Sequence, residues 1–242
     1  MDFQDINNVL ENSISQRRKL HELYAALPVT HCRRQTTCCM MLPEMTLIEA
    51  LVAMDRINKM AAPTRSQILQ KLLKYFFLNP VEITSCPFLE GRQCLIYADR
   101  FFGCRAYGLW SQDTYDKLST QTQKAKQYLQ KQWAKMGVTL PETVTGFAVP
   151  YCPYVEIAEG GEINDQQIDE IAEDIDALTR HFGKEDEAFR HHYFLDLSFL
   201  VASCTYGYTR AIQLKFTFVQ EFMSTGDRSR LDKMLLSVPD DG

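Results

Sequence analysis

The sequence lacks several features that would point to particular classes of protein. Glycine is scarce, with 11 residues among 242, which disfavours a fold built from many tight turns. Basic residues are in deficit, because 26 Lys and Arg face 31 Asp and Glu and leave a net charge of -5. Proteins that bind nucleic acid are usually basic, so we expect no nucleic-acid partner. The most apolar run, residues 193–204, contains Asp196 and falls short of the ~20 residues of a membrane span, so we expect no membrane partner.

The first residues carry no recognisable targeting signal. Residues 1–8 include Asp2 and Asp5 and no basic segment, and no apolar stretch with a small-residue cleavage site follows. This pattern differs from a secretory signal, so we expect a cytoplasmic protein. Thiols stay reduced in the cytoplasm, and clustered cysteines there serve as metal ligands or catalytic groups more often than as disulfides.

Common catalytic motifs are missing as well. The chain contains no GxxxxGK[S/T] phosphate loop, no GxGxxG after a strand, no HExxH and no GxSxG. It also has no CxxxCxxC triad and no recognisable site for S-adenosylmethionine.

Hydrophobic spacing predicts a mainly α fold, with one helical domain over residues 1–242. Apolar residues recur at intervals of three and four through most of the chain, the spacing of one helix face. Thr46 and Glu49 form a capping-box pattern at the start of one of these helices. The predicted helices cover residues 2–27, 45–60, 64–78, 113–136, 168–182 and 185–223, the last broken near Gly207.

Two segments depart from the helical pattern. Residues 81–109 show no sustained helical period and contain three cysteines, which predicts an irregular, cysteine-rich loop region. Residues 139–161 form a connector rich in Pro and Gly, and within it residues 143–149 are the best candidate for a strand.

Cysteine is the most informative residue type. Six of the eight cysteines fall in two blocks, and they are Cys32, Cys38, Cys39, Cys86, Cys94 and Cys104. Thiolates are soft ligands that suit zinc and iron–sulfur clusters, and several around one centre repel each other unless a metal neutralises them. The two helices predicted between the blocks would return the chain and bring the blocks together. The simpler alternative is that reduced cysteines pack as small hydrophobic side chains.

The two cysteine blocks resemble a known family. The run CPFLEGRQCLIYADRFFGCRAYG, residues 86–108, is similar to the second half of the YkgJ-like cysteine-cluster family, described as zinc- or iron-chelating. CRRQTTCC, residues 32–39, followed by Thr46 and Glu49, resembles its first half. Flagellin lysine N-methylases share this pattern and are held to carry an iron–sulfur centre. The similarity covers residues 32–108, under half of the chain.

The resemblance implies that all six of these cysteines are potential metal ligands. Our preferred four are Cys39, Cys86, Cys94 and Cys104, with Cys32 or Cys38 in reserve. Adjacent cysteines are expected to project differently, so Cys38 and Cys39 are not expected to bind the same ion. Two departures from the family pattern stand out, because Gln35 replaces a second cysteine of the first block and Phe101 replaces a proline. Arg100 and Arg105 are candidates to offset the negative charge of a metal centre.

Other potential ligands lie outside the blocks. Cys152, between two prolines, is either a supplementary ligand, a reactive thiol or a structural thiol in a turn. Cys204 lies in the apolar run and is expected in the core. His31 adjoins Cys32, and His191 and His192 precede the apolar run. His192 and Asp196 would be four residues apart on one helix, a spacing at which the carboxylate orients the imidazole.

The sequence therefore predicts a helical metal-binding protein that holds one [4Fe–4S] or zinc centre through thiolates, with iron–sulfur preferred. Three roles stay open. In the first, the centre is structural or senses redox state. In the second, it belongs to an iron–sulfur-dependent methyltransferase that acts on protein side chains. In the third, it only stabilises a loop that binds a protein partner.

Overall fold

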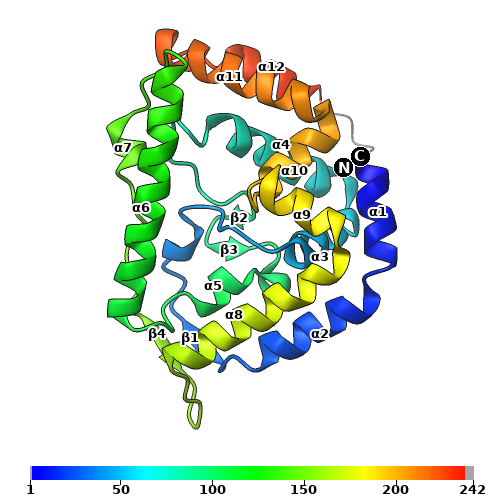
Figure 1. The fold of residues 1–242 in the computed structure, drawn as a ribbon, viewed down its shortest axis with the longest axis vertical. Coiled ribbons are helices and arrows are strands. Elements are labelled where there is room, and N and C mark those ends of the chain that lie inside the picture. Colours follow the sequence, from blue (N-terminus) through cyan, green and yellow to red (C-terminus); the bar gives the residue numbers. More distant parts are fainter. Residues whose placement is uncertain (1, 238–242) are drawn as a thin grey trace.

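The computed structural model describes residues 2–237, and most of them are helical (Figure 1). The α-helices of this part are α1 Phe3–Glu11, α2 Ile14–Ala25, α3 Leu47–Asn58, α4 Ala62–Leu78, α5 Phe102–Ala106, α6 Gln112–Lys135, α7 Glu142–Thr145, α8 Asp165–Thr179, α9 Lys184–His191, α10 Leu197–Tyr206, α11 Tyr208–Thr225 and α12 Ser229–Leu236. The mainly α prediction is thus confirmed. Within the described residues, no helix combines the length and the apolar character needed to cross a bilayer.

Four short strands form two small antiparallel sheets among the described residues. The strands are β1 Thr30–Cys32, β2 Leu89–Glu90, β3 Gln93–Cys94 and β4 Val155–Ile157. In the first sheet β1 pairs with β4, so that Cys32 lies opposite Val155. In the second sheet β2 pairs with β3, and Leu89 lies opposite Cys94.

Helix α3 is the central helix, and its sequence explains why. Thr46 and Glu49 form the predicted capping box, which satisfies backbone donors at the start of the helix. Apolar side chains cover more than one face, since Ile48 and Val52 are buried along with Leu51. A helix that is apolar nearly all round must be enclosed by others. Helix α3 contacts α1, α2, α4, α8 and α9.

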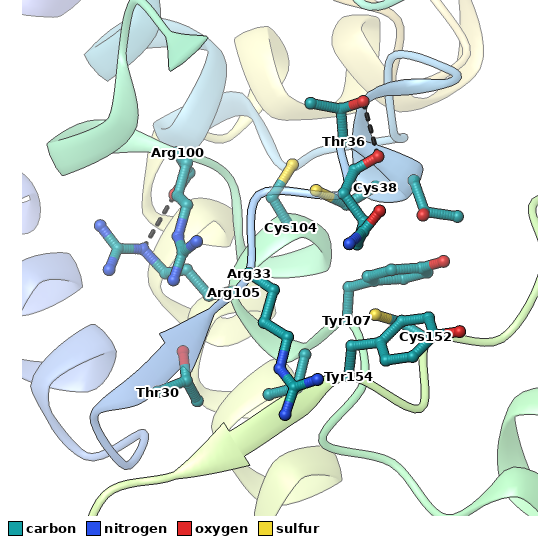
Figure 2. Close-up of a pocket in the computed structure, with 13 residues that line it drawn as sticks. Thr30, Arg33, Thr36, Cys38, Arg100, Cys104, Arg105, Tyr107, Cys152 and Tyr154 are labelled. Carbon is teal, nitrogen blue, oxygen red and sulfur yellow. Dashed lines mark hydrogen bonds between the residues drawn. The ribbon is translucent and has the colours of Figure 1, made fainter. Parts of the chain in front are cut away.

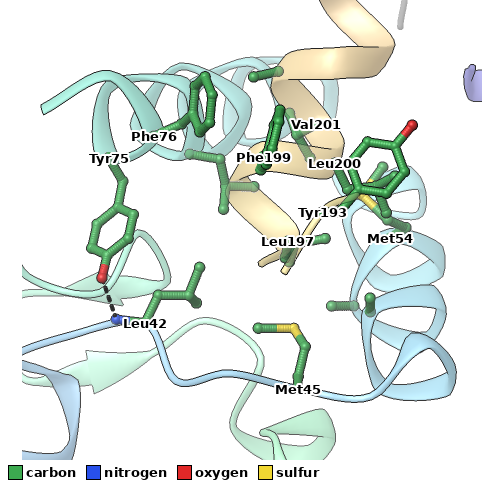
Figure 3. Packing of buried hydrophobic residues seen from close by; sticks show 14 of the residues in the cluster. Leu42, Met45, Met54, Tyr75, Phe76, Tyr193, Leu197, Phe199, Leu200 and Val201 are labelled. Atoms are coloured by element: carbon green, nitrogen blue, oxygen red, sulfur yellow. Dashed lines mark hydrogen bonds between the residues drawn. The ribbon is translucent and has the colours of Figure 1, made fainter. Parts of the chain in front are cut away.

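Aromatic side chains pack between α4 and the two helices α10 and α11, and Figure 3 shows Phe76 beside Phe199. The Phe76 ring stacks on Phe199 with ring centroids 4.8 Å apart, and Phe77 meets Phe218 edge-on at 5.2 Å. Burial of each such side chain contributes about 1.5–3 kcal/mol. Gly207 separates α10 from α11 with φ of +79°, a conformation that favours glycine.

Three sequence expectations about local structure are wrong. Residues 143–149 form no strand, because residues Glu142–Thr145 make the helix α7 after Pro141. Helix α4 begins at Ala62 rather than at residue 64, with Pro63 in its first turn. His192 and Asp196 do not share a helix, since His192 ends α9 and Asp196 caps α10. The last of these removes the proposed imidazole–carboxylate pairing.

Candidate metal centre

Five cysteines from both sequence blocks line one cavity of about 230 Å³. They are Cys38, Cys39, Cys86, Cys94 and Cys104. The rest of the lining is formed by apolar side chains such as Phe88 and Ile96 and by arginines. The prediction that the chain returns after two helices and brings the blocks together is confirmed, because α3 and α4 fill the interval between them.

Cys38 and Cys39 of the first block lie in a single turn of 3₁₀-helix, Thr37–Cys39, that directly follows a strained loop. Arg34 and Thr36 both have φ in the left-handed region, at 51° and 60°. Such backbone conformations are unfavourable for residues with side chains and are often found near functional sites. The sulfurs of Cys38 and Cys39 lie 3.7 Å apart. The two thiols are thus in hydrogen-bond contact, and the expectation that they do not bind the same ion stays a prediction.

The second block is joined to the first through the backbone. The N–H of Cys86 donates to the carbonyl of Cys39 at 2.8 Å, and the N–H of Leu89 donates to the carbonyl of Cys86 at 2.9 Å. The hairpin β2–β3 then turns the chain back, with Gly91 at φ of +57° at its tip. This hairpin brings Cys94 to the same cavity as Cys86.

A buried carboxylate positions the helix that carries Cys104. Glu49 is 3% exposed and accepts a hydrogen bond at 2.6 Å from the backbone N–H of Phe102, the first residue of α5. It also accepts hydrogen bonds from the Tyr24 hydroxyl at 2.8 Å and from the Thr46 N–H at 2.8 Å. The sequence identified Glu49 only as part of a capping box, and nothing in the sequence pattern pointed to its contact with α5.

Arg105 makes contacts that hold the segment around Cys104 in place. Its guanidinium lies 4.1 Å from the centre of the Tyr24 ring, and it donates to the carbonyls of Arg100 and Ala98. Both arginines act on the thiols. The charge of Arg100 partly counters the rise that burial causes in the pKa of Cys94 and Cys104, and Arg105 interacts electrostatically with Cys104. That Arg100 and Arg105 offset the charge of a metal centre stays a prediction.

Burial controls the protonation of most of the cavity thiols. It raises the pKa of Cys86 to about 12, and it raises the pKa of Cys94 and Cys104 as well. The hydrogen bond between Cys38 and Cys39 lowers the pKa of Cys38 and raises that of Cys39. In the absence of a metal, the buried thiols are thus protonated at neutral pH. Metal binding would release these protons, because the thiolate is the ligand.

Cys152 lines a second, smaller cavity next to the first. This space of about 30 Å³ is also bordered by Cys38, Cys104 and Tyr107 (Figure 2). Cys152 itself is buried. Figure 2 shows Cys38 and Cys104 directed toward one another on one side of this space, with Cys152 and Tyr107 on another. Cys38 and Cys104 therefore separate the two cavities.

The remaining candidate residues are not brought to the cavity. His31 is exposed on β1 opposite Glu156, and His191 and His192 are exposed around the end of α9. Cys204 packs against the hydrophobic core, as predicted. Cys32 is the last residue of β1, and its side chain lies outside what the structure describes.

Two further findings bear on identity. In the part of the chain that the structure describes, no group of three or more His, Cys, Asp and Glu side chains is arranged to hold a metal ion. Comparison with known proteins finds no matching family model, no matching curated protein and no matching solved structure. The likeness of the cysteine blocks to the YkgJ-like family accordingly stays a prediction from the motifs.

Proposed function

We propose that this protein binds one metal centre through thiolates of its two cysteine blocks, and that the centre is a [4Fe–4S] cluster. The observation that carries this proposal is the gathering of five cysteines, from residues 38 to 104 of the chain, around one cavity. Isolated reduced cysteines that served only as small hydrophobic side chains would have no reason to share one cavity.

The donor set fits an iron–sulfur cluster. Such clusters are held by four cysteine thiolates, and Cys39, Cys86, Cys94 and Cys104 would supply them, with Cys38 in reserve. A cluster of several atoms needs space between its ligands, and the five thiols border about 230 Å³. The positive charge of Arg100 would partly balance the negative charge of the centre. When bound, a [4Fe–4S] cluster supplies one-electron redox chemistry.

One distance favours zinc as the alternative metal. Two thiolates on one tetrahedral zinc ion, with bonds of about 2.3 Å, lie roughly 3.8 Å apart. Cys38 and Cys39 have this separation, with their sulfurs 3.7 Å apart. A zinc site would contain this pair together with two cysteines of the second block.

In either form the centre would stabilise the irregular segment between α4 and α6. This segment has little secondary structure of its own, and metal binding energy adds directly to folding energy where ligands come from separate segments. A structural or redox-sensing role needs no further site. Two alternatives need a second binding surface near the cavity. One is methyl transfer to a protein side chain, and the other is binding of a protein partner by the loops that the metal stabilises.

Substitution of single cysteines tests the proposal. C86S and C94S are expected to lose most of the bound metal, because each removes a thiolate from the cavity. C204S is the matched control, since Cys204 lies in α10 and packs against the core. Retention of full metal content by both C86S and C94S, in folded protein, would overturn the proposed site.

A further inference from the structure

Cys38 and Cys39 form a pair of thiols in direct contact. Their sulfurs lie 3.7 Å apart, close enough for one S–H to donate to the other. Both side chains are half-buried, whereas Cys86 of the same cavity is buried, so the pair keeps some access to solvent. Sulfurs in a disulfide are about 2.05 Å apart, so a small approach of these two would allow a bond. A small oxidant can therefore meet both thiols at one place.

Little secondary structure holds the pair in its present geometry. In the turn Thr37–Cys39, the N–H of Cys39 donates to the carbonyl of Thr36 at 2.8 Å. The N–H of Met40 donates to the carbonyl of Thr37 at 3.2 Å. A disulfide between adjacent residues closes a small ring that contains their peptide bond, and such a ring does not fit a helical turn. Formation of this bond would therefore open the turn.

The backbone of Cys39 links the pair to the second cysteine block. Its carbonyl accepts the hydrogen bond from the N–H of Cys86 at 2.8 Å. If the turn opens at Cys39, this carbonyl moves and the hydrogen bond between the blocks is lost. The oxidation state of two sulfurs would thus control the contact between two segments that α3 and α4 separate in the chain.

We propose that Cys38 and Cys39 are a redox pair that a peroxide oxidises to a disulfide, and that this bond releases the contact between the two cysteine blocks. With hydrogen peroxide, the thiolate of one cysteine attacks an oxygen, which gives a sulfenic acid and one water. The thiol of the other cysteine then attacks the sulfenic sulfur, the S–S bond forms, and the hydroxyl leaves as a second water. Altogether the two thiols lose two electrons and two protons, and the peroxide gains them.

Oxidation of the pair would also affect the metal centre. A sulfur in a disulfide is no longer a thiolate, and the thiolate is the form that binds a metal. Oxidation of Cys39 and ligation through Cys39 therefore exclude each other. This consequence rests on the proposed function, whereas formation of the disulfide does not.

Peptide mass spectrometry on the metal-free full chain tests the disulfide directly. The chain is treated with hydrogen peroxide, the remaining free thiols are alkylated, and the protein is cut with trypsin. Residues 35–56 form one tryptic peptide, which contains Cys38 and Cys39 and no other cysteine. We expect this peptide to lose two hydrogens and to take up no alkylating agent, and we expect dithiothreitol to reverse both changes.

Three results would overturn the proposed pair. The first is a disulfide from Cys38 to Cys104, the thiol that Figure 2 shows directed toward it. The second is a pair that is still fully alkylated after peroxide treatment. The third is oxidation of either thiol that dithiothreitol does not reverse.

Hydrogen exchange tests the release of the contact between the blocks. Peroxide is expected to speed exchange of the Cys86 amide by about tenfold or more, because its acceptor is lost. C38S is the matched control, since it cannot form the bond and should show the same exchange with and without peroxide. Unchanged exchange at Cys86 in protein that carries the disulfide would overturn the proposed release. Iron and zinc are measured in the protein as purified, so absent metal with a formed disulfide contradicts the metal site alone.

Discussion

The backbone N–H of Cys86 donates a hydrogen bond to the carbonyl of Cys39 at 2.8 Å. This contact joins two segments that α3 and α4 separate in the chain. It places the two cysteine blocks against each other before any metal is considered. The shared thiol cavity is therefore a property of the fold.

Glu49 is predicted to be essential for the position of Cys104. The variant E49A removes the acceptor of the Tyr24 hydroxyl and of the Phe102 N–H, both of which would then be unsatisfied in a buried place. We expect a loss of unfolding free energy on the order of 3 kcal/mol, measured by urea denaturation. E22A, at an exposed position of α2, is expected to change stability by less than about 0.5 kcal/mol. Equal stability of E49A and E22A would contradict the role of Glu49.

The two adjacent cysteines are predicted to differ in importance if the centre is an iron–sulfur cluster. Cys39 belongs to our preferred ligand set of four, whereas Cys38 is a reserve ligand that borders the same cavity. C39S is expected to lose most of the metal, and C38S is expected to keep it. Loss of metal from both variants would instead support the tetrahedral zinc site, which uses the pair with sulfurs 3.7 Å apart.

Core packing between α4 and α10 predicts a large effect at Phe76. F76A removes a ring that is 1% exposed and stacks on Phe199, so we expect destabilisation of about 3–5 kcal/mol. The control is Y128A, because Tyr128 is 63% exposed and lies on α6, away from this aromatic cluster. Urea midpoints that are equal for these two variants would show that the aromatic cluster does not hold the helices together.

Lys215 predicts a dependence of stability on pH. Burial lowers the pKa of Lys215 from 10.5 to about 8, and its ammonium donates to the Asn79 side chain at 3.0 Å. The folded protein binds the Lys215 proton less tightly than the unfolded chain does. The free energy of unfolding therefore rises as the pH increases above about 8. This gain is lost again as the pH falls to about 8, because both states then carry the proton. We expect the free energy of unfolding to increase by about 1 kcal/mol between pH ~7 and ~9.

The variant K215M isolates this contribution. It carries no titratable group at that position, so the Lys215 part of the increase should be absent. Urea denaturation of both proteins across this pH range makes the comparison. A K215M protein with the same pH dependence as the unaltered chain would show that Lys215 does not titrate in this window.

The helices could be predicted from the sequence because their signals are local. Ile168, Ile171 and Ile175 recur at the helical period, and all three are buried on α8. The Thr46–Glu49 capping box is likewise a local pattern that the structure contains. Both features depend on residues within one or two helical turns of each other.

The rest of the candidate site depends on contacts between distant residues. Thr30 pairs with Ile157 in the β1–β4 sheet, and Arg92 contacts Arg34, and neither relationship leaves a periodic signal in the sequence. The strand expected at residues 143–149 was wrong because Pro141 begins a short helix there. The two cysteine blocks predicted which thiols gather, but they did not predict the second cavity beside Cys152.

Analysis of iron, zinc and acid-labile sulfide in protein purified without oxygen tests the central claim most directly. The account predicts about four irons and four sulfides per chain, with a brown colour from broad visible absorption, as a [4Fe–4S] cluster requires. One zinc per chain without sulfide would replace the cluster by the tetrahedral zinc site. Folded protein that contains neither metal would contradict the account, and the five cavity cysteines would then be ordinary thiols.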